Sequence, residues 1–218
     1  MMREDGLVAV TLLVPMKPPR AGKSRLRGAF GVAPHTSLVL ALASDTVSAA
    51  VAAPGVDRVV VVTGDVEALA TLGDLGADVV DDEGAEDLNA ALLVAERRLF
   101  GPSRAGDAVV GALQADLPAL RPAELGRALA EAGGRRAFTA DRHGTGTTLL
   151  LSAPGGPLAP RFGVGSAAAH AASGALALTT SAPSLRSDVD TADDLAYARE
   201  LGLGTHTAEL LTQACAVP

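Results

Sequence analysis

Three aspartates in two acidic segments have the chemistry and the spacing of a metal site. Asp116 follows an apolar run in "ALQADLPAL", and Asp188 and Asp190 stand two residues apart in "LRSDVDTADDL". If the backbone over 187–190 is extended, the side chains of Asp188 and Asp190 share one face and can bind one or two divalent ions together with Asp116. Magnesium prefers oxygen ligands of this kind and completes its coordination with water and substrate phosphates.

These acidic residues also have ordinary structural interpretations. Asp116 is equally compatible with a helix cap or a turn. Asp190 and Thr191 are candidates for the N-cap of a helix over "ADDLAYARELG". We interpret Asp193 and Asp194 as acids in the first turn of that helix, where the helix dipole favours negative charge.

A cationic loop is the second candidate feature. The stretch "VPMKPPRAGKSRL" carries Lys17, Arg20, Lys23 and Arg25 directly after an apolar run. Its "GKS" is how a P-loop ends, but that pattern needs a glycine five residues before Gly22, and Lys17 stands there instead. We therefore interpret the match as chance. A strand that delivers a cationic loop suits an anionic ligand, although lysines and arginines are also common on any surface.

Two glycine-containing segments are candidates for anion binding. In "DRHGTGTTLLL", Gly144 and Gly146 open a loop, and threonines that include Thr148 supply hydroxyl groups. A glycine-rich hairpin turn explains the same residues and is the favoured interpretation for this motif alone.

In the second segment, "PRFGVGSAAAHAASG", we expect Ser166 to be the N-cap of a short helix over 167–173. Gly163 leaves backbone N–H groups open to a carboxylate or a phosphate near the helix start. Capping alone would also explain Ser166. We interpret His170 as a packing or surface histidine rather than as a base.

These candidates need a sheet whose strands end near one another. Apolar runs rich in β-branched residues alternate with segments of helical spacing, which predicts an α/β sheet that is mostly parallel and buried on both faces. Ligands of open α/β sheets lie beyond the carboxyl ends of the strands, so we expect the site around the opening loop, 63–65, 114–120 and the region after 147–151. The expected strands are 7–14, 58–63, 77–80, 108–113 and 147–151, and the expected helices are 36–53, 66–72, 88–99 and 122–132.

The composition limits the class of protein. The 218 residues suit one domain over 1–218. A net charge of −7 and an aromatic content of 2% argue against a nucleic-acid partner. Cys215 is the only cysteine, the apolar runs are too short for a membrane span, and the N-terminus lacks the flanks of a signal peptide, so we expect a cytoplasmic protein without membrane contact. No apolar stripe indicates an oligomeric state.

Seven motifs, in order, resemble those of one enzyme family. They are "VPMKPPRAGKSRL", "VVVVTGD", "DLNAAL", "ADLPAL", "DRHGTGTTLL", "PRFGVGS" and "SDVDTADDL". The set is similar to the guanylyltransferases that make the activated phospho-acid precursor of the deazaflavin coenzyme F-420. The resemblance implies a single-domain, Rossmann-like nucleotidyltransferase fold of the glycosyltransferase-A type. It also implies transfer of GMP from GTP to phosphoenolpyruvate or 2-phospho-L-lactate, with release of pyrophosphate.

The resemblance further implies a role for each candidate residue. Two lysines and an arginine face the phosphates of GTP, three aspartates hold magnesium, a threonine, a glycine and a serine hold the phospho-acid, and an asparagine lies near the nucleoside. In that order they are Lys17, Lys23 and Arg25; Asp116, Asp188 and Asp190; Thr148, Gly163 and Ser166; and Asn89. Lys17, Lys23 and Asp116 are expected to act in catalysis. One departure is Asp87, which stands where the family usually has glycine before "LNAAL".

The expected reaction needs no general base. Its nucleophile is a phosphate oxygen, largely ionised at neutral pH because the second pKa of a phosphate monoester is ~6. What the reaction needs is relief of the repulsion between two polyanions, which a metal ion and lysines provide. The lack of a histidine base is therefore expected.

Two other classes of function remain open. One is a nucleotidyltransferase acting on 3-phosphoglycerate, a sugar phosphate or molybdopterin, although such relatives lack the paired "GTGTT" and "PRFG-x-GS" motifs. The other is a nucleotide-binding domain without catalysis. The possible phospho-acids differ by small changes around one carbon, which the sequence does not separate. The Ala-, Gly- and Arg-rich composition resembles actinobacterial members of the family, and this association favours phosphoenolpyruvate.

Overall fold

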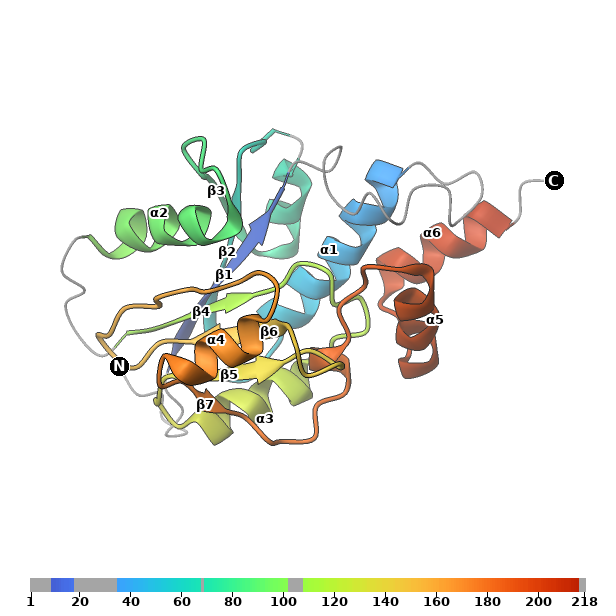
Figure 1. The fold of residues 1–218 in the computed structure, drawn as a ribbon. Helices are drawn as coiled ribbons and strands as arrows, with labels where there is room; N and C mark the ends of the chain where they lie inside the picture. Colours follow the sequence, from blue (N-terminus) through green and yellow to red (C-terminus); the bar gives the residue numbers. More distant parts are fainter. Residues whose placement is uncertain (1–8, 18–34, 68, 102–107, 216–218) are drawn as a thin grey trace.

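The computed structural model describes residues 9–17, 35–67, 69–101 and 108–215. Seven strands within these ranges form one sheet (Figure 1). They are β1 (Val10–Met16), β2 (Val56–Thr63), β3 (Asp78–Asp81), β4 (Val109–Leu113), β5 (Ala137–Ala140), β6 (Thr147–Leu151) and β7 (Leu176–Ala177).

The order of the strands across the sheet is β3, β2, β1, β4, β6, β5, β7. The pairs from β3 to β4 are parallel, as is the pair of β5 with β7. β6 is antiparallel to both of its neighbours, β4 and β5. The sheet is therefore mixed and mostly parallel, and the predicted α/β fold is confirmed.

The five predicted strands correspond to β1, β2, β3, β4 and β6, with shifts of a few residues at their ends. Residues 7 and 8 of the first predicted strand lie outside the described residues. Strands β5 and β7 were not predicted. Both are short, and β7 is an edge strand of two residues, so neither has the length over which an alternating pattern becomes visible.

Helices cover both faces of the sheet (Figure 1). Within the described residues, none of them combines the length and the apolar character that crossing a bilayer requires. The helices are α1 (His35–Val51), α2 (Leu88–Phe100), α3 (Pro122–Ala132), α4 (Ser166–Ala172), α5 (Ala192–Leu201) and α6 (Thr205–Cys215), and the 3-10 turns are η2 (Ala70–Leu75) and η3 (Ser184–Arg186).

The helix predicted over 66–72 is wrong in type and position. Residues 66 and 67 form a turn, and the 3-10 turn η2 follows. Its bonds run over three residues, as from the N–H of Leu72 to the carbonyl of Leu69. Gly76 ends it in the left-handed conformation, which glycine adopts without steric cost. Gly76 thus ends the segment after six residues, which are too few for a stable α-helix.

Two separate cores explain why the strand sequences do not alternate. Leu12 and Val14 of β1 belong to the core on the side of α1 and α3, whereas Leu13 belongs to the core on the side of α2 and α4. The same division recurs in β2 over 59–62. Both sides of these strands must therefore be apolar, as expected for parallel strands covered by helices.

A third cluster connects α1 to the C-terminal helices. Leu42 of α1 belongs to it together with Val189 and residues of α5 and α6. The buried carboxylate of Asp45 also accepts hydrogen bonds from the backbone N–H groups of His206 and Thr207, both at 2.9 Å. It thereby satisfies N–H groups that have no partner within the first turn of α6.

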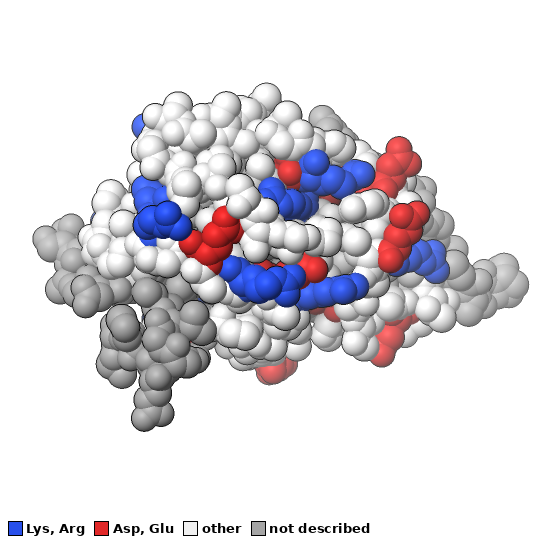
Figure 2. Space-filling model, turned by 90° about the horizontal axis from the view of Figure 1, so that it is seen from below, with Lys and Arg blue, Asp and Glu red and all other residues white. Residues whose placement is uncertain are grey.

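Charges of both signs share the surface seen from below. Figure 2 shows Lys and Arg side chains interspersed with Asp and Glu side chains on that face. Glu131 of α3 is one acidic residue that stabilises the fold locally. Its carboxylate accepts hydrogen bonds from the backbone N–H groups of Thr179 and Thr180. These bonds hold α3 against the segment that follows β7, and they lower the pKa of Glu131 below its ordinary value.

Gly111 of β4 lies where the sheet leaves no room for a side chain. A Cβ atom there would lie 2.7 Å from Leu12 Cδ2 and 2.9 Å from Leu151 Cδ2. We expect Gly111→Ala to lower the free energy of unfolding by about 1–3 kcal/mol, the usual cost of overpacking a core. Urea unfolding measures this change.

The matched control is Gly73→Ala, because a Cβ atom at Gly73 meets no other atom within 4 Å. We expect this variant to change the free energy of unfolding by less than about 0.5 kcal/mol. Equal stability of the two variants would contradict the packing argument.

Candidate functional site

The loops that carry the sequence motifs lie at one edge of the sheet because β6 runs antiparallel to β4. Leu113 pairs with Leu149, and the N–H of Gln114 donates to the carbonyl of Thr148 at 2.9 Å. The start of β6 therefore lies at the carboxyl end of β4. The region after 147–151, predicted to lie at this edge, begins at the opposite edge, where the N–H of Ser152 donates to the carbonyl of Val110 at 2.8 Å. The prediction treated this strand as parallel.

A cavity of about 300 Å³ lies between the end of β1 and the start of α2. Its lining comprises residues 15–17, Val62 and part of the segment 82–91. Lys17 is exposed and contributes the positive charge. This volume is at the lower end of the range typical of small-molecule sites. Lys23 and Arg25 lie outside the described residues, so their roles stay predictions.

Asp87, which departs from the glycine usual in the family, has a clear local role. It is the N-cap of α2, and its carboxylate accepts a hydrogen bond from the N–H of Ala90 at 2.8 Å. A glycine at this position has no side chain that could accept this bond. The substitution therefore fits the backbone at the start of α2.

Asn89 lies in the first turn of α2, and its amide is bonded to the "PRFG" segment. Nδ2 donates to the carbonyl of Phe162 at 3.0 Å, and Oδ1 accepts from the N–H of Phe162 at 2.8 Å. This pair of bonds fixes that segment to α2. The contact of Asn89 with a nucleoside stays a prediction.

Asp116 lies just past β4 and is 8% exposed. The hydroxyl of Thr46, on α1, accepts from the N–H of Leu117 at 2.9 Å and lies 3.2 Å from the carbonyl oxygen of Ala115. This hydroxyl has a single proton and lies nearer the carbonyl oxygen of Leu42, at 2.8 Å, so the bond from Leu117 is the one that fixes the backbone after Asp116 to α1. In addition, the N–H of Val189 donates to the carbonyl of Asp116 at 3.0 Å. The two acidic segments predicted from the sequence therefore lie side by side.

Burial of Val189 fixes the segment that carries Asp188 and Asp190. Val189 is 0% exposed, whereas Asp188 is half-buried and Asp190 is exposed. This alternation agrees with the extended conformation predicted for the segment.

The donor chemistry at this place fits magnesium. Carboxylate oxygens are its preferred protein ligands, and one or two of them suffice when water and phosphates complete the coordination. Among the residues that the structure describes, no three His, Cys, Asp or Glu side chains are grouped closely enough to hold a metal ion. A complete cluster of three carboxylates is thus not formed within that part of the chain.

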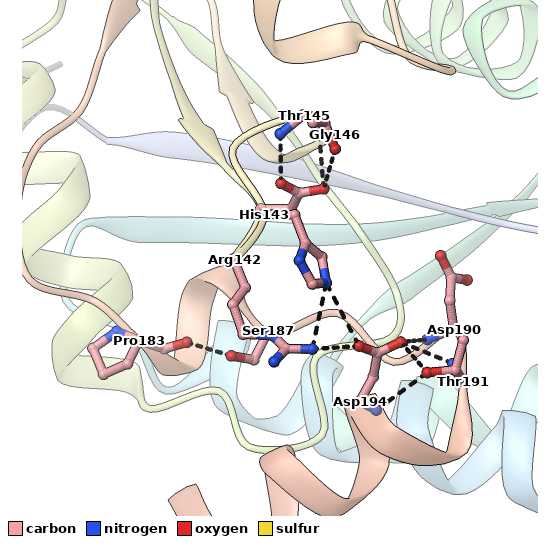
Figure 3. Close-up of polar contacts among 10 residues, drawn as sticks. Arg142, His143, Thr145, Gly146, Pro183, Ser187, Asp190, Thr191 and Asp194 are labelled. Atoms are coloured by element: carbon pink, nitrogen blue, oxygen red, sulfur yellow. Dashed lines mark hydrogen bonds and ion pairs between the residues drawn. The ribbon is translucent and has the colours of Figure 1, made fainter.

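The "GTGTT" loop is a closed hairpin turn between β5 and β6. The carboxylate of Asp141 accepts from the N–H groups of Thr145 at 2.9 Å and of Gly146 at 2.7 Å (Figure 3). A Cβ atom at Gly146 would collide with this carboxylate, so glycine is required there. The hairpin interpretation is confirmed, because these two N–H groups already have a partner.

Arg142 connects this hairpin to α5. Its guanidinium donates to the carboxylate of Asp194 at 2.6 Å and lies 4.6 Å from the ring centroid of Tyr197. Its backbone N–H donates to the carbonyl of Arg186 at 2.7 Å. Figure 3 shows the side chains of Arg142 and His143 pointing from the hairpin toward Asp194. The hairpin is therefore attached to the chain both before and after the acidic segment.

Asp194 also completes the cap of α5. Its carboxylate accepts from the N–H of Thr191 at 2.9 Å, and the hydroxyl of Thr191 accepts from the N–H of Asp194 at 3.2 Å. The expected cap is thus confirmed at Thr191, with Asp194 in the first turn. Burial raises the pKa of Asp194, but hydrogen bonds from Thr191 and Arg142 outweigh this effect and hold the pKa below its ordinary value.

The "PRFGVGS" segment returns to the same edge of the sheet. Its predicted N-cap is wrong by one residue, since Gly165 is the N-cap and Ser166 is the first residue of α4. Gly165 has a left-handed φ of 73°, which glycine adopts without steric cost, and no side chain caps the helix. The Oγ of Ser166 donates instead to Thr147 Oγ1 at 3.2 Å. The N–H of Ala167 donates to the carbonyl of Thr145 at 3.1 Å, so α4 begins against the hairpin.

The residues predicted to bind the phospho-acid differ in accessibility. Gly163 is exposed, whereas Thr148 and Ser166 are buried at 0% and 2%. The hydroxyl of Thr148 lies 3.5 Å from the carbonyl oxygen of Thr139. Their contact with a phospho-acid stays a prediction.

His170 is a fully buried histidine, as one of the two sequence interpretations had it. Its Nε2 accepts from the N–H of Arg161 at 2.9 Å, and its Nδ1 lies 2.9 Å from Thr147 Oγ1. A backbone N–H can only donate, so Nε2 is unprotonated and the proton is on Nδ1. Burial, followed by the positive charges of Arg136 and Arg161, lowers the pKa of His170 to about 4.

Two of these contacts have no signal in the sequence. Arg142 lies inside "DRHGTGTT", but its partner Asp194 is 52 residues away. Thr46 lies 71 residues from Leu117 in the middle of α1. Neither pair follows a helical or strand spacing, so pairing signals from related sequences would be needed to find them.

Comparison with known proteins gives strong matches over most of the chain. A family model described as guanylyl transferase CofC like matches residues 10–215. The phosphoenolpyruvate guanylyltransferase of Salinispora arenicola is 53% identical over 203 residues, which are 92% of this chain and 92% of that protein. The protein of the same name from Thermomonospora curvata is 50% identical over 94% of this chain and 90% of its own length.

Solved structures share the fold at much lower identity. A 4-diphosphocytidyl-2C-methyl-D-erythritol synthase matches with a TM-score of 0.60 and 16% identity, over 89% of this chain and 99% of its own. A protein described as a nucleotide-diphospho-sugar transferase from Desulfovibrio desulfuricans matches with a TM-score of 0.64 and 17% identity, over 94% and 97%. These likenesses show the predicted nucleotidyltransferase fold, and the family match over residues 10–215 shows that the chain belongs to the CofC-like guanylyl transferase family.

Proposed function

We propose that this chain transfers GMP from GTP to phosphoenolpyruvate and releases pyrophosphate, as a step in coenzyme F-420 biosynthesis. Relatives that are 50–53% identical carry the name phosphoenolpyruvate guanylyltransferase, which supports this choice of acceptor. The observation that carries the proposal is the meeting of three features at one edge of the sheet. They are the cavity beside Lys17, the adjoining acidic segments around Asp116 and 188–190, and the returning "PRFGVGS" segment.

GTP would occupy the cavity at the end of β1. The cavity lining includes the carboxylates of Asp82 and Glu86. Such groups can accept hydrogen bonds from N1–H and from the 2-amino group of guanine, and adenine has neither donor. Lys17 belongs to the same lining and supplies positive charge for the triphosphate, and Lys23 and Arg25 follow it in the sequence.

Magnesium would be held by one or two of the carboxylates of Asp116, Asp188 and Asp190, which are not grouped as a set of three in the described residues, with water and substrate phosphates completing its coordination. When bound, it would offset negative charge on the phosphates. The chain's own contribution is to hold these carboxylates in place. The bond that Thr46 accepts from the backbone just after Asp116 and the burial of Val189 both serve this purpose.

The phospho-acid would bind along the segment from Gly163 to Ser166, close to Thr148. A phosphate oxygen of the acceptor attacks the α-phosphorus of GTP and forms a new P–O bond. The bond from the α-phosphorus to the oxygen bridging to the β-phosphate breaks, and pyrophosphate leaves with that electron pair. The attacking oxygen is already ionised at neutral pH, so no side chain has to remove a proton.

Release of pyrophosphate from GTP and phosphoenolpyruvate tests the proposal directly. We expect release only when the purified protein, Mg²⁺ and both substrates are present, and we expect the GMP adduct in the mass spectrum. 2-Phospho-L-lactate and 3-phosphoglycerate tested in parallel identify the acceptor, and ATP in place of GTP tests base selection. Binding of GTP without any release would instead favour a non-catalytic domain.

The predicted metal ligands can be tested by removing charge while keeping side-chain shape. We expect Asp116→Asn and Asp188→Asn to lower kcat by about 100-fold or more, as for other groups that stabilise transition-state charge. Asp193→Asn is the control, since Asp193 is an exposed acid in the first turn of α5. Near-wild-type GMP transfer by either of the first two variants would refute the metal assignment.

Lys23→Ala tests the role of the cationic loop. Loss of a charged partner for the triphosphate should raise the KM for GTP or lower kcat by about tenfold or more. Arg199→Ala, which removes an exposed charge from α5, is the matched control and should leave both constants unchanged. Unchanged GTP affinity and turnover in Lys23→Ala would refute the assignment of Lys23 to the nucleotide.

A further inference from the structure

His170 lies at the centre of a buried polar network that the proposed transfer does not use. The ring is 0% exposed and lies edge-on to Phe162, with centroids 5.1 Å apart. Both ring nitrogens are engaged, Nε2 by the N–H of Arg161 and Nδ1 by Thr147 Oγ1. A histidine without a free nitrogen or access to solvent is not placed to act as a general acid or base.

The network holds the start of the "PRFGVGS" segment from two sides. On one side His170 of α4 accepts from the N–H of Arg161. On the other side Asn89 of α2 bonds to both the N–H and the carbonyl of Phe162. Three backbone polar groups of Arg161 and Phe162, just before Gly163, thus have side-chain partners from two different helices. A loop with no ladder of its own takes a defined path in this way.

The same network holds the end of the segment through Thr147. Thr147 Oγ1 accepts the Nδ1–H of His170 and also accepts from the Oγ of Ser166 at 3.2 Å. His170 is therefore linked directly to residue 161 and, through one hydroxyl, to residue 166. Because Ser166 and His170 both belong to α4, the bond from Arg161 to the ring holds the start of the segment against the helix in which the segment ends. The N–H of Ser166, which donates to the carbonyl of Gly163 at 3.1 Å, holds the segment as well.

We infer that His170 is a positioning residue for the acceptor, because its neutral ring holds the backbone of Arg161 against α4 and so contributes to the shape of the segment from Arg161 to Ser166. The inference rests on the proposed function, which assigns that segment to the phospho-acid. His170 acts through Arg161 and Ser166 and does not itself touch the substrate.

The network requires the neutral form of His170. A proton on Nε2 would face the N–H of Arg161, and two donors cannot bond to each other. The charged groups that face the ring, Arg136 and Arg161, also oppose a positive charge there, and together with burial they lower the pKa to about 4. The ring thus stays an acceptor toward Arg161 at neutral pH.

Two variants test the two hydrogen bonds of the His170 ring separately, the one to Arg161 and the one to Thr147. His170→Asn can place an amide where Nδ1 was, which keeps a donor for Thr147 but leaves the N–H of Arg161 without its acceptor. His170→Gln can place an amide oxygen where Nε2 was and so restores that acceptor. We expect His170→Asn to raise the KM for phosphoenolpyruvate by about tenfold, the usual scale of one lost buried hydrogen bond, with a smaller rise in His170→Gln. The KM for GTP should stay within about twofold in both, as for a residue that affects one substrate only.

Thr147 provides a matched pair that leaves His170 unchanged. Thr147→Val removes the hydroxyl that links His170 to Ser166, whereas Thr147→Ser keeps it. We expect the KM for phosphoenolpyruvate to rise in Thr147→Val and to stay near the wild-type value in Thr147→Ser. This pair decides the question if the histidine variants do not fold, which thermal unfolding of each protein will reveal.

The outcomes separate this inference from the proposed function. If the wild-type protein transfers GMP but folded variants keep an unchanged KM for phosphoenolpyruvate, the positioning role is wrong and the proposed function stands. Parallel changes in the KM values of both substrates would show a purely structural role and would also overturn the inference. If the wild-type protein transfers no GMP to any phospho-acid, both the proposed function and the inference fall.

Discussion

The antiparallel pairing of β6 with β4 is the constraint on which the site depends. A parallel β6 would begin at the far edge of the sheet and would place the β5–β6 hairpin away from Asp116. The reversal brings the hairpin to the carboxyl end of β4, where the segment 188–190 and the start of α4 can attach to it. One change of strand direction thus converts the usual ligand edge of an α/β sheet into a place where two anionic substrates can meet.

Buried side-chain hydrogen bonds then give the loops their shape. Thr46 and Asn89 bond to backbone groups that are 71 and 73 residues away in the sequence, and His170 bonds to the N–H of Arg161 in the loop before its own helix. The loops at this edge lack the ladder bonds of a strand, so their N–H and carbonyl groups need such partners when they are buried. The aliphatic cores stabilise the fold but do not determine the paths of these loops. The polar contacts determine those paths.

The sequence predicts this protein well where local patterns are strong. The strand over 147–151 and the helix starting at Pro122 were predicted at their observed positions, because a β-branched and leucine-rich run and an N1 proline are local signals. No local pattern in the sequence predicts the direction of β6, since that direction depends on the strands with which β6 pairs. The partner of Arg142 and the bonds of His170 are likewise set by tertiary packing, so the sequence placed their motifs at the site without their contacts.

Asn89 connects the cavity at the start of α2 to the "PRFGVGS" segment. It lies in the first turn of α2, beside the cavity whose lining includes Leu88 and Ala91, and its amide bonds to Phe162 of the returning segment. The start of α2 and the "PRFGVGS" segment are therefore fixed to each other. A ligand that orders one of the two regions lowers the conformational entropy that the second ligand has to give up. Cooperative binding can arise from this link without a change of shape.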